Sequence, residues 1–208
     1  MTEIRSLSTL LTDLKNSFQD QDDISIGQIL EAFHERGFGF FLFLFALPAA
    51  LPIPAVGYGT VLALPLIFLT VQQAMGRHTI WFPDTVKTKS LKRVRLHNTI
   101  DASLPWIKKL EFLIRPRLSF MTSGFMSHLV GLAGFIMACS ILLPIPLTNT
   151  VPSFGIALMA VGVITRDGLA VLAGAVIGLL WVSALVGFTL YFGAEGLEIF
   201  KNMIKSIL

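Results

Sequence analysis

The first 37 residues mix apolar and polar positions at the spacing of amphipathic helices. The apolar positions of the first predicted helix are Ile4, Leu7, Leu10, Leu11, Leu14 and Phe18, and those of the second are Ile26, Ile29, Leu30 and Phe33. Ser25 and Gln28 form the capping-box pattern at the start of the second helix, and Gly37 predicts its end. Both helices are too polar to cross a membrane, so we expect them to lie on its surface or to pack against a polar loop.

Two long apolar segments, 38–76 and 118–167, follow the same plan. Each is interrupted by Leu-Pro-Ile-Pro, at residues 51–54 and 143–146, and each later half ends at an arginine, Arg77 or Arg166. Two prolines in three residues must break a helix, because proline removes a backbone donor and clashes with the preceding turn. The repeat predicts two pseudo-symmetric helical hairpins. Broken backbone is tolerated in a membrane only against protein or a wet cavity, so each hairpin either spans the membrane or re-enters and stops part-way.

The segment between the hairpins, 77–117, is polar and strongly basic. It contains most of the sixteen basic residues of the chain, against only Asp84, Asp101 and Glu111. A positive segment between apolar ones predicts a cytoplasmic location by the positive-inside rule. Within it, Leu104–Ile114 mixes apolar and charged residues, which is typical of a helix in the headgroup region. No aromatic and basic surface for reading nucleic acid accompanies the charge, so we expect no nucleic-acid partner.

Residues 168–208 complete the chain with one more span. Leu169–Gly193 is long enough to cross a bilayer, and Glu195–Leu208 predicts an amphipathic tail. Hydrophobic residues make up 54% of the chain and charged residues 14%, compared with about 25% charged residues in soluble domains. The polar, acidic N-terminus predicts no cleavable signal peptide. We therefore expect an all-α, multi-pass integral membrane protein.

Few side chains in the sequence suggest catalysis or metal binding. Cys139 is the single cysteine, so neither a disulfide framework nor a thiolate metal site is expected. Glu31, His34 and Glu35 share one helix, but no second cluster of ligands completes a metal site. No Ser-His-Asp arrangement, phosphate loop or pair of intramembrane carboxylates is present. The sequence therefore predicts a protein that is not an enzyme and needs no cofactor.

Polar residues after the second Leu-Pro-Ile-Pro copy predict a ligand site. Asn149 and Thr150 are good N-cap residues, and Pro152 fits the first turn of the helix that follows. A helix that starts there would point its free N–H groups and the positive end of its dipole at an anion. Arg166 could supply a positive charge if the helix folds back, or it could form a turn with Asp167. The predicted substrate-binding residues are Thr148, Asn149, Thr150, Ser153, Arg166 and Arg77.

Several short strings occur in a characteristic order over about residues 5–195. They are Glu35-Arg36-Gly37-Phe38-Gly39, Ala46-Leu47-Pro48, the two Leu-Pro-Ile-Pro copies, Trp81-Phe82-Pro83, Leu104-Pro105-Trp106, Arg115-Pro116-Arg117, Asn149-Thr150-Val151-Pro152 and Thr165-Arg166-Asp167-Gly168. In this order the chain resembles the ExoD family, which is named for bacterial exopolysaccharide synthesis. It departs from the family pattern at Ala49-Ala50, where a polar residue such as Asn would be expected. The resemblance implies a small inner-membrane protein connected with exopolysaccharide production, and it implies no catalytic residue.

Two functions fit these patterns. The first is a non-enzymatic transporter or binder of an anionic lipid, such as the polyprenyl phosphate that carries sugars during polysaccharide assembly. The second is a membrane scaffold that organises polysaccharide-synthesis proteins through its cytoplasmic surface. Four glycines, Gly131, Gly134, Gly174 and Gly178, could allow close helix packing within one subunit or between two subunits of a homo-oligomer.

Overall fold

A computed structural model describes residues 7–18, 21–33, 37–51, 58–77, 79–94, 96–98, 100–101, 104–105, 108, 117–143 and 148–207. In chain order the elements are α1 (Leu7–Ser17), β1 (Asp23–Ser25), α2 (Ile26–Phe33), α3 (Gly37–Ala50), α4 (Tyr58–Ala74), α5 (Asp84–Lys87), β2 (Ser90–Lys92), the 3-10 helix η2 (Ser119–Thr122), α7 (Phe125–Leu142), α8 (Thr150–Thr165) and α9 (Gly168–Ile207). The prediction of a helical protein is confirmed. The two strands were not predicted, and most of the predicted interfacial helix Leu104–Ile114 lies outside the described residues.

The N-terminal elements fold together with part of the basic segment. Strands β1 and β2 pair antiparallel, with Asp23 opposite Lys92 and Ser25 opposite Ser90, and α2 contacts α5. Ile24, Ile29 and Ile100 are almost fully buried between these elements. We call residues 7–33 and 84–101 the charged unit. Of the two locations expected for the N-terminal helices, the structure shows packing against the central segment.

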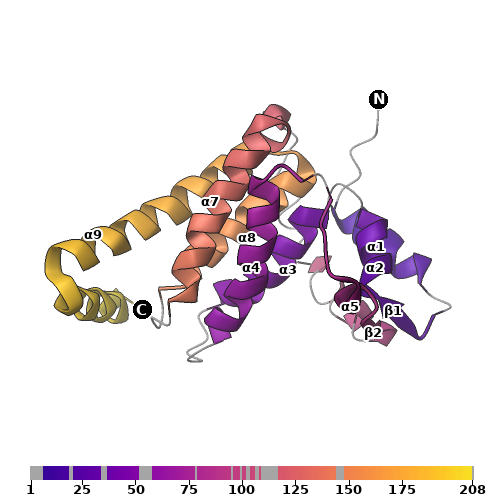
Figure 1. Cartoon of the computed structure of the whole chain (residues 1–208), viewed down its shortest axis with the longest axis horizontal. Coiled ribbons are helices and arrows are strands. Elements are labelled where there is room, and N and C mark those ends of the chain that lie inside the picture. Colours follow the sequence, from indigo (N-terminus) through magenta and orange to yellow (C-terminus); the bar gives the residue numbers. More distant parts are fainter. Residues whose placement is uncertain are drawn as a thin grey trace.

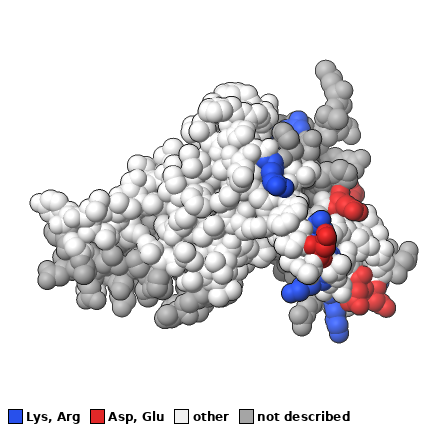
Figure 2. Space-filling view, viewed as in Figure 1, with Lys and Arg blue, Asp and Glu red and all other residues white. Residues whose placement is uncertain are grey.

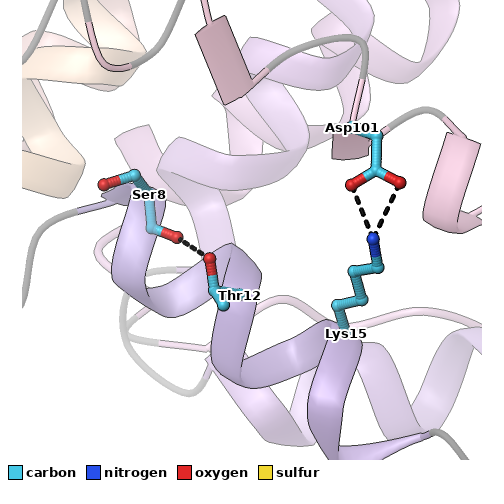
Figure 3. A network of polar contacts seen from close by, with 4 residues as sticks. All are labelled: Ser8, Thr12, Lys15 and Asp101. Atoms are coloured by element: carbon cyan, nitrogen blue, oxygen red, sulfur yellow. Dashed lines mark hydrogen bonds and ion pairs between the residues drawn. The ribbon is translucent and has the colours of Figure 1, made fainter.

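Two sets of side-chain hydrogen bonds stabilise the charged unit, one within a single helix start and one between distant segments. The backbone N–H of Ser25 donates to Gln28 Oε1 (2.8 Å), and the backbone N–H of Gln28 donates to Ser25 Oγ (3.1 Å), which confirms the predicted capping box. Lys15 Nζ on α1 lies 2.6 and 2.7 Å from the two carboxylate oxygens of Asp101, and so joins segments far apart in the sequence (Figure 3).

The expected helix end at Gly37 is wrong, because Gly37 is the first residue of α3. Helix α2 is described as far as Phe33, and residues 34–36 lie outside the described residues. The physical reason lies in the apolar run that follows, because Phe38 and Phe41 are buried in the core and continue a helix from Gly37 onward.

The five apolar helices form a bundle beside the charged unit (Figure 1). Helix α3 packs mainly along α8, α4 along α7, and α8 along α9, whereas contacts within each hairpin are less extensive. No Asp, Glu, Lys or Arg occurs in residues 37–76, 118–165 or 168–194. Figure 2 shows the result, because the charged side chains that it draws gather at one side of the molecule and leave the bundle without charge.

Glycines allow the helices of the bundle to approach closely. A Cβ atom on Gly174 of α9 would lie 2.5 Å from Gly155 O of α8, and one on Gly131 of α7 would overlap the backbone of Gln73 and Ala74 in α4. Gly134 and Gly178 likewise face Thr70 and Met137. All four glycines predicted to allow close packing therefore do so within one subunit.

In the part of the chain that the structure describes, two helices are long and apolar enough to cross a membrane, Phe125–Leu142 and Gly168–Tyr191. Helix α7 begins seven residues later than the apolar run predicted, because Leu118 adopts a left-handed conformation (φ 50°) and Ser119–Thr122 form a 3-10 turn. Gly193 has a φ of 61° and kinks α9, which agrees with the predicted boundary between span and tail. Helices α3, α4 and α8 are shorter, with 14, 17 and 16 residues.

Candidate functional site

The bundle has two chemically different ends. At the first end, which we call the arginine end, α4 and α8 terminate just before Arg77 and Arg166, and α7 and α9 begin. At the second, which we call the proline end, α3 and α7 terminate and α4 and α8 begin. Here the Thr60 hydroxyl of α4 donates to the carbonyl of Leu142, the last residue of α7 (3.4 Å). The predicted site residues are divided between these two ends.

The start of α8 lies where the sequence predicted it. Asn149 occupies the N-cap position, its carbonyl accepts a hydrogen bond from the backbone N–H of Ser153 (3.1 Å), and Pro152 lies buried in the first turn. The Asn149 side chain makes no capping hydrogen bond. It lies instead against Gly59, where a Cβ atom would approach Asn149 Nδ2 to 2.5 Å. The starts of α4 and α8 are therefore neighbours, although the sequence places them about ninety residues apart.

Two oxygen atoms at this end are buried and have no hydrogen-bond partner among the described residues. Ser153 is fully buried, and its Oγ is unpaired, as is the buried Oδ1 of Asn149. A buried polar atom without a partner costs about 1–3 kcal/mol, and the large majority of buried side-chain polar atoms in proteins are paired. Gln73 Oε1 of α4 is a third oxygen of this kind in the bundle. Asn149 and Ser153 differ from it in lying together at the start of one helix, where a polar group of a ligand would gain hydrogen bonds from both.

Thr148 and Trp181 complete the surroundings of the start of α8. Thr148 is buried, and its carbonyl accepts a hydrogen bond from Trp181 Nε1 of α9 (3.1 Å). Gly59, Thr60 and Trp181 were not among the residues predicted from the sequence. The first two could have been found by superposing the two Leu-Pro-Ile-Pro copies, which aligns residues 57–60 with 149–152. Trp181 gave no such signal, since a tryptophan in an apolar helix usually packs or anchors.

The arginine end is built from helix caps. The backbone N–H of Arg77 donates to Gln72 O (3.1 Å), and that of Asp167 donates to Gly162 O (2.9 Å), so α4 and α8 end in the same type of turn. The left-handed residue of that turn is Gly76 (φ 78°) in the first case and Arg166 (φ 56°) in the second. Arg166 thus forms a turn beside Asp167, which was one of the two predicted arrangements.

The structure does not bring the arginines to the polar residues at the start of α8. Helix α8 is continuous from Thr150 to Thr165, so Arg166 follows Ser153 by thirteen residues, or about 20 Å along the helix axis. Arg77 lies at the same end as Arg166, after α4. A hairpin that folded back could have joined the two groups, but α8 contains no break.

Asp167 has a structural role at the arginine end. It is only 5% exposed, and its Oδ1 accepts hydrogen bonds from the backbone N–H groups of Leu169 (2.9 Å) and Ala170 (3.3 Å) in the first turn of α9. A carboxylate in this position caps the helix and matches its dipole. In the part of the chain that the structure describes, no three His, Cys, Asp or Glu side chains are placed to hold a metal ion. His34 and Glu35 lie outside that part.

Comparison with known proteins identifies the family. The sequence pattern of the family described as "Exopolysaccharide synthesis, ExoD" matches residues 7–187. The chain belongs to the ExoD family. Protein ExoD of Rhizobium meliloti (strain 1021) is 32% identical over 202 residues, which cover 94% of this chain and 80% of that protein. An uncharacterized protein of Synechocystis sp. is also 32% identical, over 207 residues that cover 96% of this chain and 97% of that protein. No solved structure matches the chain.

Proposed function

We propose that this ExoD-family protein works in the bacterial inner membrane during exopolysaccharide synthesis, where it binds or transports an anionic lipid without catalysing a reaction. Two helices are long enough to cross a bilayer, and the three segments that form the bundle contain no charged residue. A polyprenyl phosphate is the kind of lipid we propose. The observation that carries the proposal is the pair of unpartnered buried oxygens, on Asn149 and Ser153, at the start of α8.

The arrangement at the proline end suits a phosphate group. The N-terminal ends of α4 and α8 lie side by side, and each carries the positive end of a helix dipole. The Ser153 hydroxyl can donate to a phosphate oxygen, and Asn149 Oδ1 can accept from a protonated phosphate or a hydroxyl. Thr148 and Thr150 add neutral polar groups. The proposed site thus attracts an anion without a buried side-chain charge.

We also propose that the two hairpins are copies of one ancestral unit. The main contacts between the hairpins are those of α3 with α8 and of α7 with α4. In both cases the first helix of one hairpin packs against the second helix of the other, so the two contacts correspond. Gly39 and Gly131 each precede their Leu-Pro-Ile-Pro copy by twelve residues, and each lies against the later helix of the other hairpin. This correspondence supports the duplication.

Arg77 and Arg166 have a separate role in this proposal. Both are exposed at the arginine end, on the side of the bundle that carries the basic segment. There they would contact anionic headgroups of the nearer leaflet, at about 1 kcal/mol for each charge. They would hold the protein at this surface, while the phosphate bound at the proline end contacts Asn149 and Ser153.

The test is binding of a polyprenyl phosphate to the purified full chain, measured by native mass spectrometry with the unphosphorylated polyprenol as the reference ligand. Asn149→Ala and Ser153→Ala should each weaken phosphate binding by about tenfold, since a hydrogen bond to a charged group contributes about 1.5–3 kcal/mol. Ser153→Ala should not lower thermal stability in the absence of lipid, because it removes an unpaired buried oxygen. Ser140→Ala is the matched control. Ser140 is also buried in the bundle, but its hydroxyl donates to Met137 O (2.8 Å).

Wild-type affinity in both variants would contradict lipid-phosphate recognition at this site. The scaffold function would then be the better proposal, and one observation favours it. The charged unit is folded, with Ile24 and Ile29 buried in the core that it shares with the bundle, and its exposed charged residues (Figure 2) could hold protein partners. In that case charge reversal at Lys92 and Arg93 would abolish the capture of polysaccharide-synthesis proteins, whereas Asn149→Ala would not affect it.

A further inference from the structure

Helix α9 extends well beyond the proline end of the bundle. Trp181 is level with the start of α8, because its Nε1 donates to Thr148 O (3.1 Å). Among the described side chains of α9, Val182 is the last in the main core, and Leu185 belongs to a separate small cluster. Farther along, Leu190 and Tyr191 are 81% and 84% exposed, and a Cβ atom on Gly187 would meet nothing within 4 Å. Figure 1 shows this part of α9 reaching past the other apolar helices.

The rise of about 1.5 Å per residue in an α-helix gives the distance of each position along α9 from its start. Trp181 lies thirteen residues after Gly168, the start of α9, which corresponds to about 20 Å. Tyr191, the end of the apolar stretch, lies about 35 Å from the same start. The hydrocarbon core of a bilayer is about 30 Å thick, so α9 crosses it with a modest tilt. A bilayer that α9 spans therefore extends some 10 Å beyond the proline end.

The geometry points to two re-entrant hairpins, and we propose that α3–α4 and α7–α8 enter from the arginine end and stop inside the bilayer. The start of α8 then lies about two-thirds of the way across, and its polar residues open toward the leaflet opposite the charged unit. This inference rests on the proposed membrane location, but it does not depend on which lipid the protein binds.

The surface of the proline end supports this placement. Leu51, which follows α3, and Leu143, which follows α7, are about half exposed, and Val61 and Leu64 at the start of α4 are more exposed still. Exposure of this apolar surface to water would be unfavourable, whereas contact with lipid chains would remove it from water. The absence of Asp, Glu, Lys and Arg from residues 37–76 and 118–165 is also what submerged hairpins require. At the arginine end, by contrast, Arg77 and Arg166 meet the water interface.

The depth of the hairpin ends has a consequence for the proposed site. A phosphate group can approach the start of α8 from the opposite leaflet by crossing only some 10 Å, against about 20 Å from the side of the charged unit. The low dielectric at that depth strengthens its interaction with the helix dipoles and with the Ser153 hydroxyl. The site would therefore receive headgroups from the opposite leaflet, and the arginine end would face the cytoplasm.

The test measures the depth of single spin labels in the full chain. Cys139→Ala removes the only cysteine, and single cysteines then replace Leu51, Leu143, Ser119 and Tyr191 in turn. Each nitroxide-labelled variant is placed in vesicles of phosphatidylcholine and phosphatidylglycerol, and its collision rates with oxygen and with a neutral nickel complex give its depth. Leu64→Cys, at an exposed position of α4, is the reference for a label within hydrocarbon.

Labels at Ser119 and Tyr191 should collide frequently with the nickel complex, as groups near the two membrane surfaces do. Labels at Leu51 and Leu143 should favour oxygen and lie about 10 Å deeper than the label at Tyr191. Equal depth at Leu143 and Tyr191, or at Leu51 and Tyr191, would show that the hairpin spans the bilayer and would overturn the proposal. No polyprenyl phosphate is added, so failure of this test is distinct from failure of lipid recognition at Asn149.

Discussion

The two hairpins share a plan, but their ends differ in chemistry. In the first hairpin α4 begins with Tyr58, Gly59 and Thr60, and Gly59 leaves room for the side chain of Asn149. In the second hairpin α8 begins beside Asn149 and Ser153, whose buried oxygens lack partners. One copy thus provides space and a second helix dipole, and the other provides the polar groups. In the proposed duplication, the two copies divide the proposed site between them while keeping the same packing.

The largest expected effect tests the packing that the hairpins share. Gly131→Ala should lower the free energy of unfolding by about 2 kcal/mol, and the melting temperature by about 4–8 °C, because the new methyl group overlaps the backbone of α4. Gly39→Ala should cost about half as much. The atom added at Gly39 would meet Ile164 Cγ1 at 2.5 Å and a single backbone atom, Ala160 O, at 2.9 Å, whereas the three atoms nearest to one added at Gly131 are all backbone atoms of α4. Thermal unfolding in detergent measures both values.

Gly187→Ala is the control for that measurement. A Cβ atom at Gly187 would meet nothing within 4 Å, so alanine should leave stability unchanged or raise it by up to about 1 kcal/mol through helix propensity. A loss at Gly39 that equals or exceeds the loss at Gly131 would contradict this account of the two contacts.

The next effect concerns the point where the second hairpin continues into α9. Asp167→Ala should cost about 1 kcal/mol, or about 2–4 °C in melting temperature, because it removes the cap from Leu169 N and Ala170 N. Asp167→Asn keeps an acceptor oxygen and should retain most of the stability. Asp84→Ala is the control, since the Asp84 side chain is 93% exposed and its ion pair with Lys87 contributes little. Equal losses in Asp167→Ala and Asp84→Ala would exclude the capping role.

The smallest effect concerns the corresponding end of the first hairpin. Helix α4 has no following helix to continue it, and its Ala74 carbonyl is instead bonded to Nδ1 of His128 on α7 (2.9 Å). His128→Ala should cost about 0.5 kcal/mol, the lower end of the usual range for one hydrogen bond. His128→Asn, which keeps a side-chain donor, should lose less. Melting temperatures in detergent compare the variants, and a loss in His128→Ala as large as that in Asp167→Ala would mean that the two hairpin ends do not differ as proposed.

Much of the fold could be predicted because local rules decide it. The capping box of Ser25 and Gln28 formed as expected, and so did the helix starts near Thr150 and the break at Gly193. Hydrophobic periodicity and proline chemistry act over a few residues, so the sequence displays them directly. The features that were not predicted depend on residues far apart in the sequence. The pairing of Ser25 with Ser90 across the small sheet and the first turn of α3 at Gly37 depend on contacts with distant segments.

The candidate site could be predicted only in part for the same reason. Thr148, Asn149, Thr150 and Ser153 are close in sequence, and they remain close at the start of one helix. The sequence could not show that Arg166 lies about 20 Å from them, because that distance follows from an unbroken α8. Nor could it show that Gly59 and Trp181 meet this helix start.

The sequence by itself determined that this protein is helical and that its charge is separated from its apolar segments, since composition and periodicity are properties of the chain alone. It also determined the start of α8 and the break at Gly193, because capping residues and glycine act on their own backbone, whereas the prolines of both Leu-Pro-Ile-Pro copies lie outside the described residues. Only the tertiary structure decided that α3 packs on α8 and α4 on α7, and that the starts of α4 and α8 meet. Those contacts depend on how separate helices fit together, and glycines such as Gly131 and Gly174 reveal their partners only once the helices are packed.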